Sequence, residues 1–433
     1  MWAFNFSGIV ETIFVGKFGE AALAAAGITN FIIYLACSLA IGIGIGVQTE
    51  TAHRLGRQIQ FLARPLNAGI LVCLGVTAAF SALIWIVAPF LMQQFTEDPA
   101  VLAITMPFTQ LKLIGLWAYS LVYIFRGYWM AIQRPIPAFL ILLLTNGLVI
   151  VFDAILMFGL FGFPALGFLG AGIGFSLAGI IGSAIFIGWS WIERDHSGFF
   201  QGLPDAFDFK QVIKLGTPAG IQEGFVAIGM SLLILVFGKI GTTEQAVGNV
   251  LIQLSTLLIL PAIGFGLATH SLVGEAYGKG DLAELKAWSN RIALVALAFT
   301  GVVSGMLILF SRPILGLFLS NPEAVHLAHM PFVIDLITIT LFSVGIVYEY
   351  TLKGMGKMVL SLCISTCLYL LIIGPIFGMM LLNIPLSILK IWIMFALFNT
   401  AYWGVYFVAF RLTRKSVHHL AVADGTGISP IER

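Results

Sequence analysis

Long apolar stretches alternate with short polar breaks along almost the whole chain of 433 residues. A helix rises about 1.5 Å per residue, so roughly 20 apolar residues are enough to cross a bilayer. Each long stretch therefore predicts a membrane-spanning helix. Twelve are predicted, over residues 2–16, 28–50, 66–95, 103–131, 136–160, 168–192, 212–238, 246–272, 288–319, 328–352, 358–382 and 386–411.

The second half of the chain repeats the first. The segment from Phe14 to Gly56 recurs 222 residues later without a gap, as in the pairs Gly16/Gly238, Lys17/Lys239, Gly19/Gly241, Gly42/Gly264, Gly44/Gly266 and Gly56/Gly278. The spacing then changes to 224, as in Pro89/Pro313 and Pro107/Pro331. A duplicated hydrophobic chain is typical of transporters, in which two similar bundles surround a pseudo-two-fold axis and the substrate site lies between them.

The repeat and the polar stretch from Glu193 to Lys210 define the predicted domains. We expect a six-helix N-terminal lobe at 1–192, a cytoplasmic linker at 193–211, a six-helix C-terminal lobe at 212–411 and a cytoplasmic tail at 412–433. The predicted seventh helix begins near Val212, whose repeat partner would precede Met1. We therefore expect either a misassigned start codon, which we favour, or a first helix that is short.

Basic residues predict how the chain is oriented. Of the 22 Lys and Arg residues, 17 fall on the side that holds both termini and the even-to-odd loops, and 5 fall on the other side. Cytoplasmic loops of membrane proteins carry the excess of Lys and Arg. The tally predicts a multi-pass protein of the bacterial inner membrane with both termini in the cytoplasm.

Composition narrows the class of protein. The chain is 59% hydrophobic and 10% charged, which excludes a soluble domain. The net charge of +2 is not clustered, so no nucleic-acid partner is expected. Cys363 and Cys367 lie in an apolar run, where small buried residues are a better interpretation than metal ligands. No HExxH or GxSxG motif is present, so neither an enzyme nor a cofactor is predicted.

Two carboxylates lie at similar membrane depth in the N-terminal half. Glu11 is six residues before Lys17, about 9 Å from the predicted outer end of its helix, and Asp153 is about 12 Å from the end of its own. An ionisable group at this depth is a functional candidate because it is costly to bury. We predict that the two share H⁺ or hold Na⁺ as an ion-coupling site. The alternative is two separate carboxylates, each hydrogen-bonded to a neighbouring helix.

Three further polar residues are candidates for substrate binding. Glu223, with Gln222 beside it, lies near the middle of the predicted seventh helix and suits a cationic substrate. Pairing of Glu223 with a polar group of the predicted eighth helix, 246–272, is an equal alternative. Asp335 is the third, at nearly the same depth as Lys112 on the corresponding helix of the other repeat. An Asp335–Lys112 ion pair is one interpretation, but the two helices belong to different lobes, and a structural role for both is favoured.

Several segments resemble known family signatures. VETIFVGKFGEAALAAAG (Val10 to Gly27) is similar to the first-helix signature of the multidrug and toxic compound extrusion (MATE) family. So are GFGLATHSLVGEAYGKGD (Gly264 to Asp281), FRGYWMAIQRP (Phe125 to Pro135) and FDAILMFGLFGFPALGFLGAG (Phe152 to Gly172). The resemblance covers nearly the whole chain in the right order.

This resemblance implies a V-shaped pair of six-helix lobes that exports organic cations or other amphipathic compounds in exchange for H⁺ or Na⁺. The family's acidic position in helix 1 is usually Asp and is Glu11 here, whereas the helix 5 position is matched by Asp153. An Asn found one turn earlier in some members is replaced by Val149, with Asn146 nearby. Glu223 is about one turn away from the helix 7 Glu of another subgroup.

We therefore predict an all-α polytopic membrane protein that acts as a monomeric secondary antiporter, surrounded by membrane lipid, for small amphipathic or cationic substrates. Glu11, Asp153 and Asn146 are the predicted ion-coupling residues, with Na⁺ at Glu11 and Asp153 as the alternative to H⁺. Two other classes stay open. One is a major facilitator transporter, to whose loop after helix 2 HRLGRQ (His53 to Gln58) is loosely similar. The other is a lipid-linked sugar flippase of the same superfamily.

Overall fold

The computed structural model describes residues 2–95, 99–200, 202–319, 321–382 and 387–423, and within these ranges the chain is helical without any strand. The long helices are α1 (Trp2–Gly16), α2 (Glu20–Gly56), α3 (Arg64–Phe95), α4 (Pro99–Ala131), α5 (Pro135–Phe158), α6 (Leu169–Ile192), α8 (Ala206–Ile240), α9 (Thr242–Lys279), α10 (Leu282–Leu309), α12 (Pro322–Gly354), α13 (Met358–Leu381) and α14 (Ile388–Ala423). Three short elements join them: η1 (Leu160–Gly162), α7 (Arg194–Ser197) and α11 (Ser311–Phe318).

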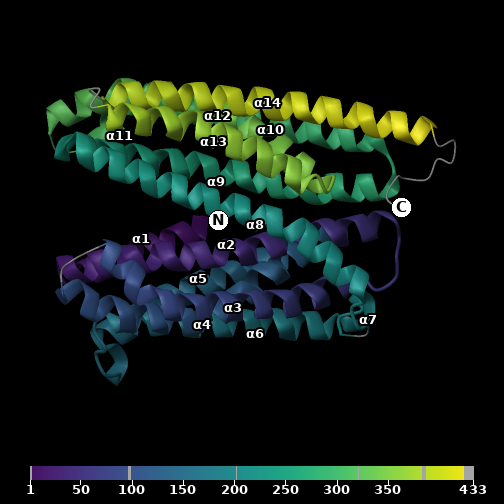
Figure 1. Ribbon diagram of the computed structural model, residues 1–433, viewed down its shortest axis with the longest axis horizontal. Coiled ribbons are helices and arrows are strands. Elements are labelled where there is room, and N and C mark those ends of the chain that lie inside the picture. Colours follow the sequence, from purple (N-terminus) through teal and green to yellow (C-terminus); the bar gives the residue numbers. More distant parts are fainter. Residues whose placement is uncertain (1, 96–98, 201, 320, 383–386, 424–433) are drawn as a thin grey trace. The chain divides into compact units, whose positions relative to one another are not determined.

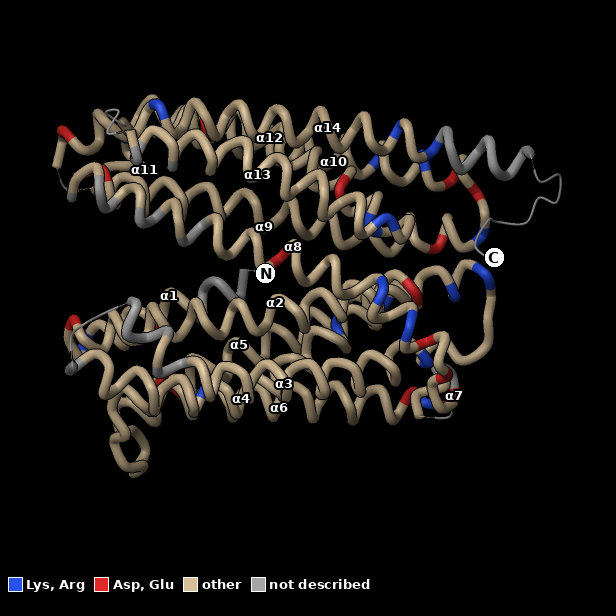
Figure 2. The backbone as a smooth tube through the Cα atoms, in the orientation of Figure 1, with Lys and Arg blue, Asp and Glu red and all other residues tan. Residues whose placement is uncertain are grey.

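The predicted class, an all-α polytopic membrane protein, is confirmed. Among the described residues, ten helices are long and apolar enough to cross a membrane, and α1 and α8 are not among the ten. A count of twelve spans therefore stays a prediction. Helices are the expected solution because a bilayer offers no water to backbone N–H and C=O groups, which must bond within their own segment. Most of the charged positions lie at the helix ends (Figure 2).

Several predicted boundaries differ from the structure, since α2 begins at Glu20 and not at 28, and α9 ends at Lys279 and not at 272. The segment predicted as one helix over 288–319 is divided, since α10 ends at Leu309 and α11 begins at Ser311. The cause is Pro313, which lacks an N–H to donate to Leu309 and whose ring would clash with that carbonyl in a continuous helix. The last helix continues to Ala423, beyond the predicted end at 411, while its predicted start at 386 and residues 424–433 lie outside the described residues.

The chain divides into two compact units, which we call the N-terminal unit (Met1–Gly224) and the C-terminal unit (Phe225–Arg433). In the N-terminal unit α2 packs against α3 and α4, and α5 packs against α1 and α6 (Figure 1). In the C-terminal unit α12 packs against α9, α10 and α14. The division falls inside α8 and not in the linker predicted at 193–211, and the predicted domain boundaries stay a prediction.

Glycines explain why the first part of α8 belongs to the N-terminal unit. A Cβ on Gly42 of α2 would collide with the backbone of Gly216 and Gly220 in α8. A Cβ on Gly46 would lie 2.8 Å from Gly216 N. Small residues spaced four apart on both helices let the two backbones approach closely. The contact joins α8 to α2 along one helical face.

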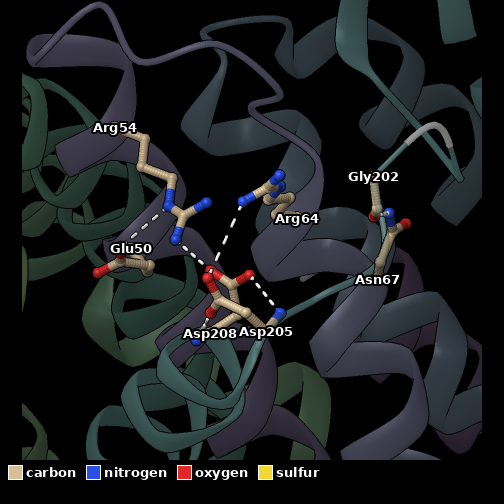
Figure 3. Close-up of polar contacts among 7 residues, drawn as sticks. All are labelled: Glu50, Arg54, Arg64, Asn67, Gly202, Asp205 and Asp208. Atoms are coloured by element: carbon tan, nitrogen blue, oxygen red, sulfur yellow. Dashed lines mark hydrogen bonds and ion pairs between the residues drawn. The ribbon is translucent and has the colours of Figure 1, made fainter.

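The beginning of α8 is also held by charge (Figure 3). Asp205 and Asp208 form a reciprocal cap, in which the Asp208 N–H donates to Asp205 Oδ1 at 2.9 Å and the Asp205 N–H donates to Asp208 Oδ2 at 3.0 Å. Arg54 at the end of α2 donates to the buried Asp208 carboxylate and, at 3.0 Å, to Glu50 Oε1. One guanidinium therefore joins the end of α2 to the start of α8.

The linker before α8 is attached to α3. Asn67 Nδ2 donates to the Gly202 carbonyl at 3.1 Å, and Asn67 Oδ1 accepts from the Phe200 N–H at 3.5 Å. Arg64 lies 3.9 Å from Asp205 (Figure 3). The described part of this linker thus belongs to the N-terminal unit in its contacts as well as in its position along the chain.

The glycine contact gives the first testable prediction. We expect Gly42→Ala to lower the apparent melting temperature of the purified protein, because the new methyl group forces the α2 and α8 backbones apart at an overpacking cost of about 1–3 kcal/mol. Gly264→Ala is the matched control, since Gly264 is the repeat partner of Gly42 and a Cβ there meets no atom within 4 Å. Equal melting temperatures for the two variants would contradict the close α2–α8 contact.

The cap gives a prediction about pH. The Asp208 N–H, which donates to Asp205, lowers the pKa of Asp205 below its usual value, and Arg64 adds to this effect. Because the folded state favours the ionised form, the stabilisation is complete above the usual pKa of about 3.9 and is lost as the pH falls through the lower folded value. Hydrogen-exchange protection of the first turn of α8 should therefore decrease below about pH 4.

Asp205→Asn should remove that pH dependence and also reduce the protection at neutral pH. Asp281→Asn is a suitable control, because Asp281 caps α10 in the same way by accepting from the Ala283 and Glu284 N–H groups. It should leave the protection of α8 unchanged. A pH profile of α8 that is the same in wild type and in Asp205→Asn would show that Asp205 does not hold this helix start.

Candidate functional site

A cavity of about 180 Å³ lies within the N-terminal unit. It is lined from five helices by Ser7, Gly8, Glu11, Asn30, Ile33, Tyr34, Cys37, Lys112, Tyr119, Tyr123, Val149 and Phe175. We call it the N-terminal cavity. Its wall is mostly aromatic and aliphatic, with a small number of polar groups directed inwards. Such a lining is typical of a small-molecule or ion site.

A buried ion pair occupies one side of the N-terminal cavity. Lys112 Nζ of α4 lies 2.6 Å from Glu11 Oε1 of α1 and donates to Asn30 Oδ1 of α2 at 2.7 Å. Lys112 is 2% exposed and Glu11 is 7% exposed. Charges removed from water in this way need a partner and further hydrogen bonds, and Asn30 supplies one of these. Three helices thus meet at one ammonium group.

Aromatic rings complete the surroundings of that ammonium. Lys112 Nζ lies 4.9 Å from the ring centre of Phe108 and 5.3 Å from that of Phe175. A cation over an aromatic face is attracted by the ring quadrupole. Tyr119 stacks on Phe175 with the ring centres 4.4 Å apart, which fixes the position of this wall. The lysine is therefore held on several sides.

Asn146 connects α5 to two neighbouring helices. Its side-chain oxygen accepts from Ser7 Oγ of α1 at 3.1 Å and from the Tyr119 hydroxyl of α4 at 3.4 Å. Its amide nitrogen donates to the Leu142 carbonyl at 2.7 Å. Asn146 therefore positions α1 beside α5 at one edge of the N-terminal cavity. The predicted coupling role of Asn146 stays a prediction.

Asp153 is a buried carboxylate on α5 and is 1% exposed. Among the residues that the structure describes, neither of its oxygens has a hydrogen-bond partner. A Cβ on Gly174 of α6 would collide with Asp153 Oδ1, so the carboxyl group fits there only because residue 174 is glycine. A buried polar group without a partner is unusual in a folded protein and points to a functional role.

Two contacts between α1 and α5 show that Glu11 and Asp153 lie at similar depth. Ser7 bonds to Asn146, and the rings of Phe14 and Phe158 lie 5.4 Å apart. Both carboxylates fall between these contacts, with Glu11 three residues before Phe14 and Asp153 five residues before Phe158. Counted at the helical rise from either contact, the two levels lie within about 5 Å of each other.

The C-terminal unit also holds a buried carboxylate beside a cavity, whose volume is about 80 Å³. Asp335 of α12 accepts from the Ser255 hydroxyl of α9. Asn399, which also lines this cavity, donates from Nδ2 to Thr338 Oγ1 at 3.2 Å. Aliphatic side chains and five aromatic ones form most of the rest of the wall, the aromatic ones being Phe342, Tyr369, Trp392, Phe395 and Phe398. One carboxylate within an aromatic lining is a suitable surface for an organic cation.

The interpretation of Asp335 and Lys112 as an ion pair is wrong. Lys112 pairs with Glu11 inside the N-terminal unit, and Asp335 bonds to Ser255. The partnership of Glu11 with Lys112 was missed, although the sequence shows both residues at membrane depth in one half. Gln222 is buried and Glu223 is half-buried, and neither residue lines the two cavities described above. Their substrate role stays a prediction.

Comparison with known proteins decides the family. The MatE family model matches residues 1–155 and 218–389, well over half of the chain. This chain belongs to the MatE family. Membership excludes the major facilitator alternative, since the match covers parts of both repeats of this MatE protein.

Sequence relatives agree with this assignment. A probable multidrug resistance protein NorM of Thermotoga maritima is 22% identical over 350 residues, which cover 80% of this chain and 74% of the relative. The protein of the same description from Bradyrhizobium diazoefficiens is 23% identical over 418 residues, covering 93% of this chain and 88% of the relative.

Solved structures share the fold of this MatE protein. A crystal structure of a Vibrio cholerae MATE transporter has a TM-score of 0.88 at 16% identity, covering 96% of this chain and 94% of that chain. A MOP superfamily transporter from Pyrococcus furiosus, described as having a binding pocket of reverse polarity that suggests a different function, has a TM-score of 0.85 at 20% identity, covering 96% of this chain and 93% of that one.

The ion pair gives a prediction about stability. Glu11→Gln leaves the ammonium of Lys112 buried without its carboxylate, and removing one partner of a buried pair typically costs about 3–5 kcal/mol. Lys112→Met in the same chain removes the second charge. The double variant should therefore have a higher apparent melting temperature in detergent micelles than Glu11→Gln alone. If the changes in melting temperature caused by Glu11→Gln and Lys112→Met simply added in the double variant, that result would contradict the pairing.

Proposed function

We propose that this MatE protein is a cation-coupled exporter of organic cations or other amphipathic compounds across the bacterial inner membrane, with both termini in the cytoplasm. The observation that carries the proposal is the N-terminal cavity, where a Glu11–Lys112 pair lies at nearly the depth of the buried Asp153. The names of the sequence relatives, probable multidrug resistance proteins, support the substrate class.

The coupling step follows from the charges in the N-terminal cavity. A cation that enters from outside, H⁺ or Na⁺, binds at Glu11 and Asp153 and neutralises negative charge there. The contact that holds α1 to α4 through Glu11 then weakens, which leaves α1 held to α5 through Ser7. Movement of α1 links ion binding to release of the substrate, and alternating access completes the cycle.

Substrate recognition is assigned to the C-terminal unit and to the middle of α8. Asp335 offers a carboxylate beside a wall of aromatic rings, which suits a cationic and partly apolar molecule. Glu223 and Gln222 on α8 are retained as further substrate contacts. Ion and substrate then use separate groups, so the two can be tested separately.

Transport in liposomes tests the proposal. We would reconstitute the protein and follow a fluorescent organic cation under a pH gradient or a Na⁺ gradient, each applied separately. The charges cancel when one coupling ion is exchanged for one monovalent dye cation, so the ion gradient is the driving force, and each tenfold gradient contributes about 1.4 kcal/mol, enough for about tenfold accumulation. Wild type should accumulate the dye under one of the gradients. Asp153→Asn and Glu11→Gln should lose this accumulation, because each removes a carboxylate that binds the coupling ion.

Glu20→Gln is the matched control, since Glu20 is an exposed carboxylate at the start of α2 and should keep full transport. Normal accumulation by Asp153→Asn and Glu11→Gln would sink the assignment of the coupling site. Absence of cation transport in wild type under both gradients would instead favour the flippase alternative, for which a lipid-linked substrate would be the next one to assay.

A further inference from the structure

We propose that Lys112 is a built-in cation of the N-terminal carboxylate site, which keeps Na⁺ away from Glu11 and so selects H⁺ as the coupling ion. The part of this inference that concerns coupling rests on the proposed function. The part that concerns ion binding stands on the contacts of Lys112 alone. It adds a specificity-determining residue that contacts a coupling carboxylate directly.

The first argument is the supply of oxygen ligands. A hard metal cation needs several oxygen ligands at short distance. In the N-terminal cavity the ammonium already takes Glu11 Oε1 at 2.6 Å and Asn30 Oδ1 at 2.7 Å. A sodium ion at Glu11 would have to displace the ammonium from both oxygens. A proton needs only one carboxylate oxygen and no coordination shell.

The second argument is that the ammonium is buried. Lys112 is 2% exposed, and the rings of Phe108 and Phe175 lie against it. A lysine at a helix end can extend its charge to water, but this one is enclosed. A second cation placed beside it would meet an unscreened like charge, because burial reduces the screening by water and salt. This repulsion opposes a proton on Glu11 as well as Na⁺, so the discrimination against Na⁺ lies in the two oxygens that the ammonium already occupies.

The groups that face Lys112 from each neighbouring helix are consistent with this assignment. Glu11 faces it from α1 and Asn30 from α2, and the cavity wall adds the hydroxyl of Tyr34 and the thiol of Cys37. Asp153 of α5 is the remaining carboxylate at this depth. When Glu11 takes up a proton, the ammonium of Lys112 loses its anionic partner. Asp153 lies at a similar depth and accepts no hydrogen bond from the described residues, so its carboxylate is the alternative partner for the ammonium.

Direct Na⁺ binding tests the inference without any transport. We would measure ²²Na⁺ binding to the purified full-length protein, and the thermal shift caused by NaCl against equal choline chloride, in four chains: wild type, Lys112→Arg, Lys112→Gln and Lys112→Gln with Glu11→Gln. Lys112→Gln removes the charge but keeps an amide donor for Glu11 and Asn30, which protects the fold. Lys112→Arg keeps the charge and is the matched control.

We expect Lys112→Gln to bind Na⁺ at least about tenfold more tightly than wild type or Lys112→Arg. Its melting temperature should rise with NaCl, and both effects should disappear in the double variant. Should Lys112→Gln unfold, Lys112→Met is assayed in its place. Equal Na⁺ binding in wild type and in the charge-removing variant, whether strong or absent, overturns the inference.

Failure of the proposed function would look different. If wild type transports no cation but the Na⁺ binding pattern above is found, the coupling role falls and the assignment of Lys112 as the occupant of the site stands. If wild type transports the dye under a Na⁺ gradient with Lys112 in place, the exporter stands and the assignment of Lys112 is overturned.

Discussion

Burial of charge where no water is available is the constraint on which this structure depends. The backbone meets it by forming helices, whose N–H and C=O groups bond within each segment. Side chains meet it by pairing, as Lys112 does with Glu11 and Asn30 of two other helices, and as Arg54 does with Asp208 of α8 and Glu50 of its own helix. The first group of contacts holds three helices of the N-terminal unit together, and the second fixes where α8 begins. Asp153, without a hydrogen-bond partner among the described residues, is the exception and for that reason a candidate for function.

Repetition in the sequence is reproduced in the order of the helices but not in the chemistry of the two units. The N-terminal cavity combines a paired acid and base with polar groups from several helices, whereas the C-terminal cavity has one acid in an aromatic lining. Leu233 occupies the position that corresponds to Glu11 in the second repeat. A duplicated scaffold allows one copy to specialise for a small ion and the other for a larger organic molecule, since packing needs the repeated glycines and apolar residues but not the carboxylates.

Much of the fold could be predicted from the sequence because the hydrophobic pattern reports helix length directly. The ends of α5 and α6 agree closely with the apolar stretches. The break at Phe310 was missed because only two polar residues, Ser311 and Arg312, interrupt the apolar pattern there, and the effect of Pro313 depends on which carbonyl lies four residues before it. Depth along a helix could be predicted for Glu11, Asp153 and Lys112. The direction in which each side chain points around its helix axis could not be predicted, and this direction decides that Lys112 faces Glu11.

Because of the close glycine contact between α2 and α8, the boundary between the sequence repeats differs from the boundary between the packed units. By descent, the chain splits between its two repeats, in the polar stretch before α8. By packing, it splits inside α8, because Gly216 and Gly220 leave no space between that helix and α2. A gene cut at the repeat boundary would therefore leave the first fragment without a helical segment that covers α2, and would give the second fragment an apolar end without its neighbour. The unit that was duplicated and the unit that packs are different pieces of chain.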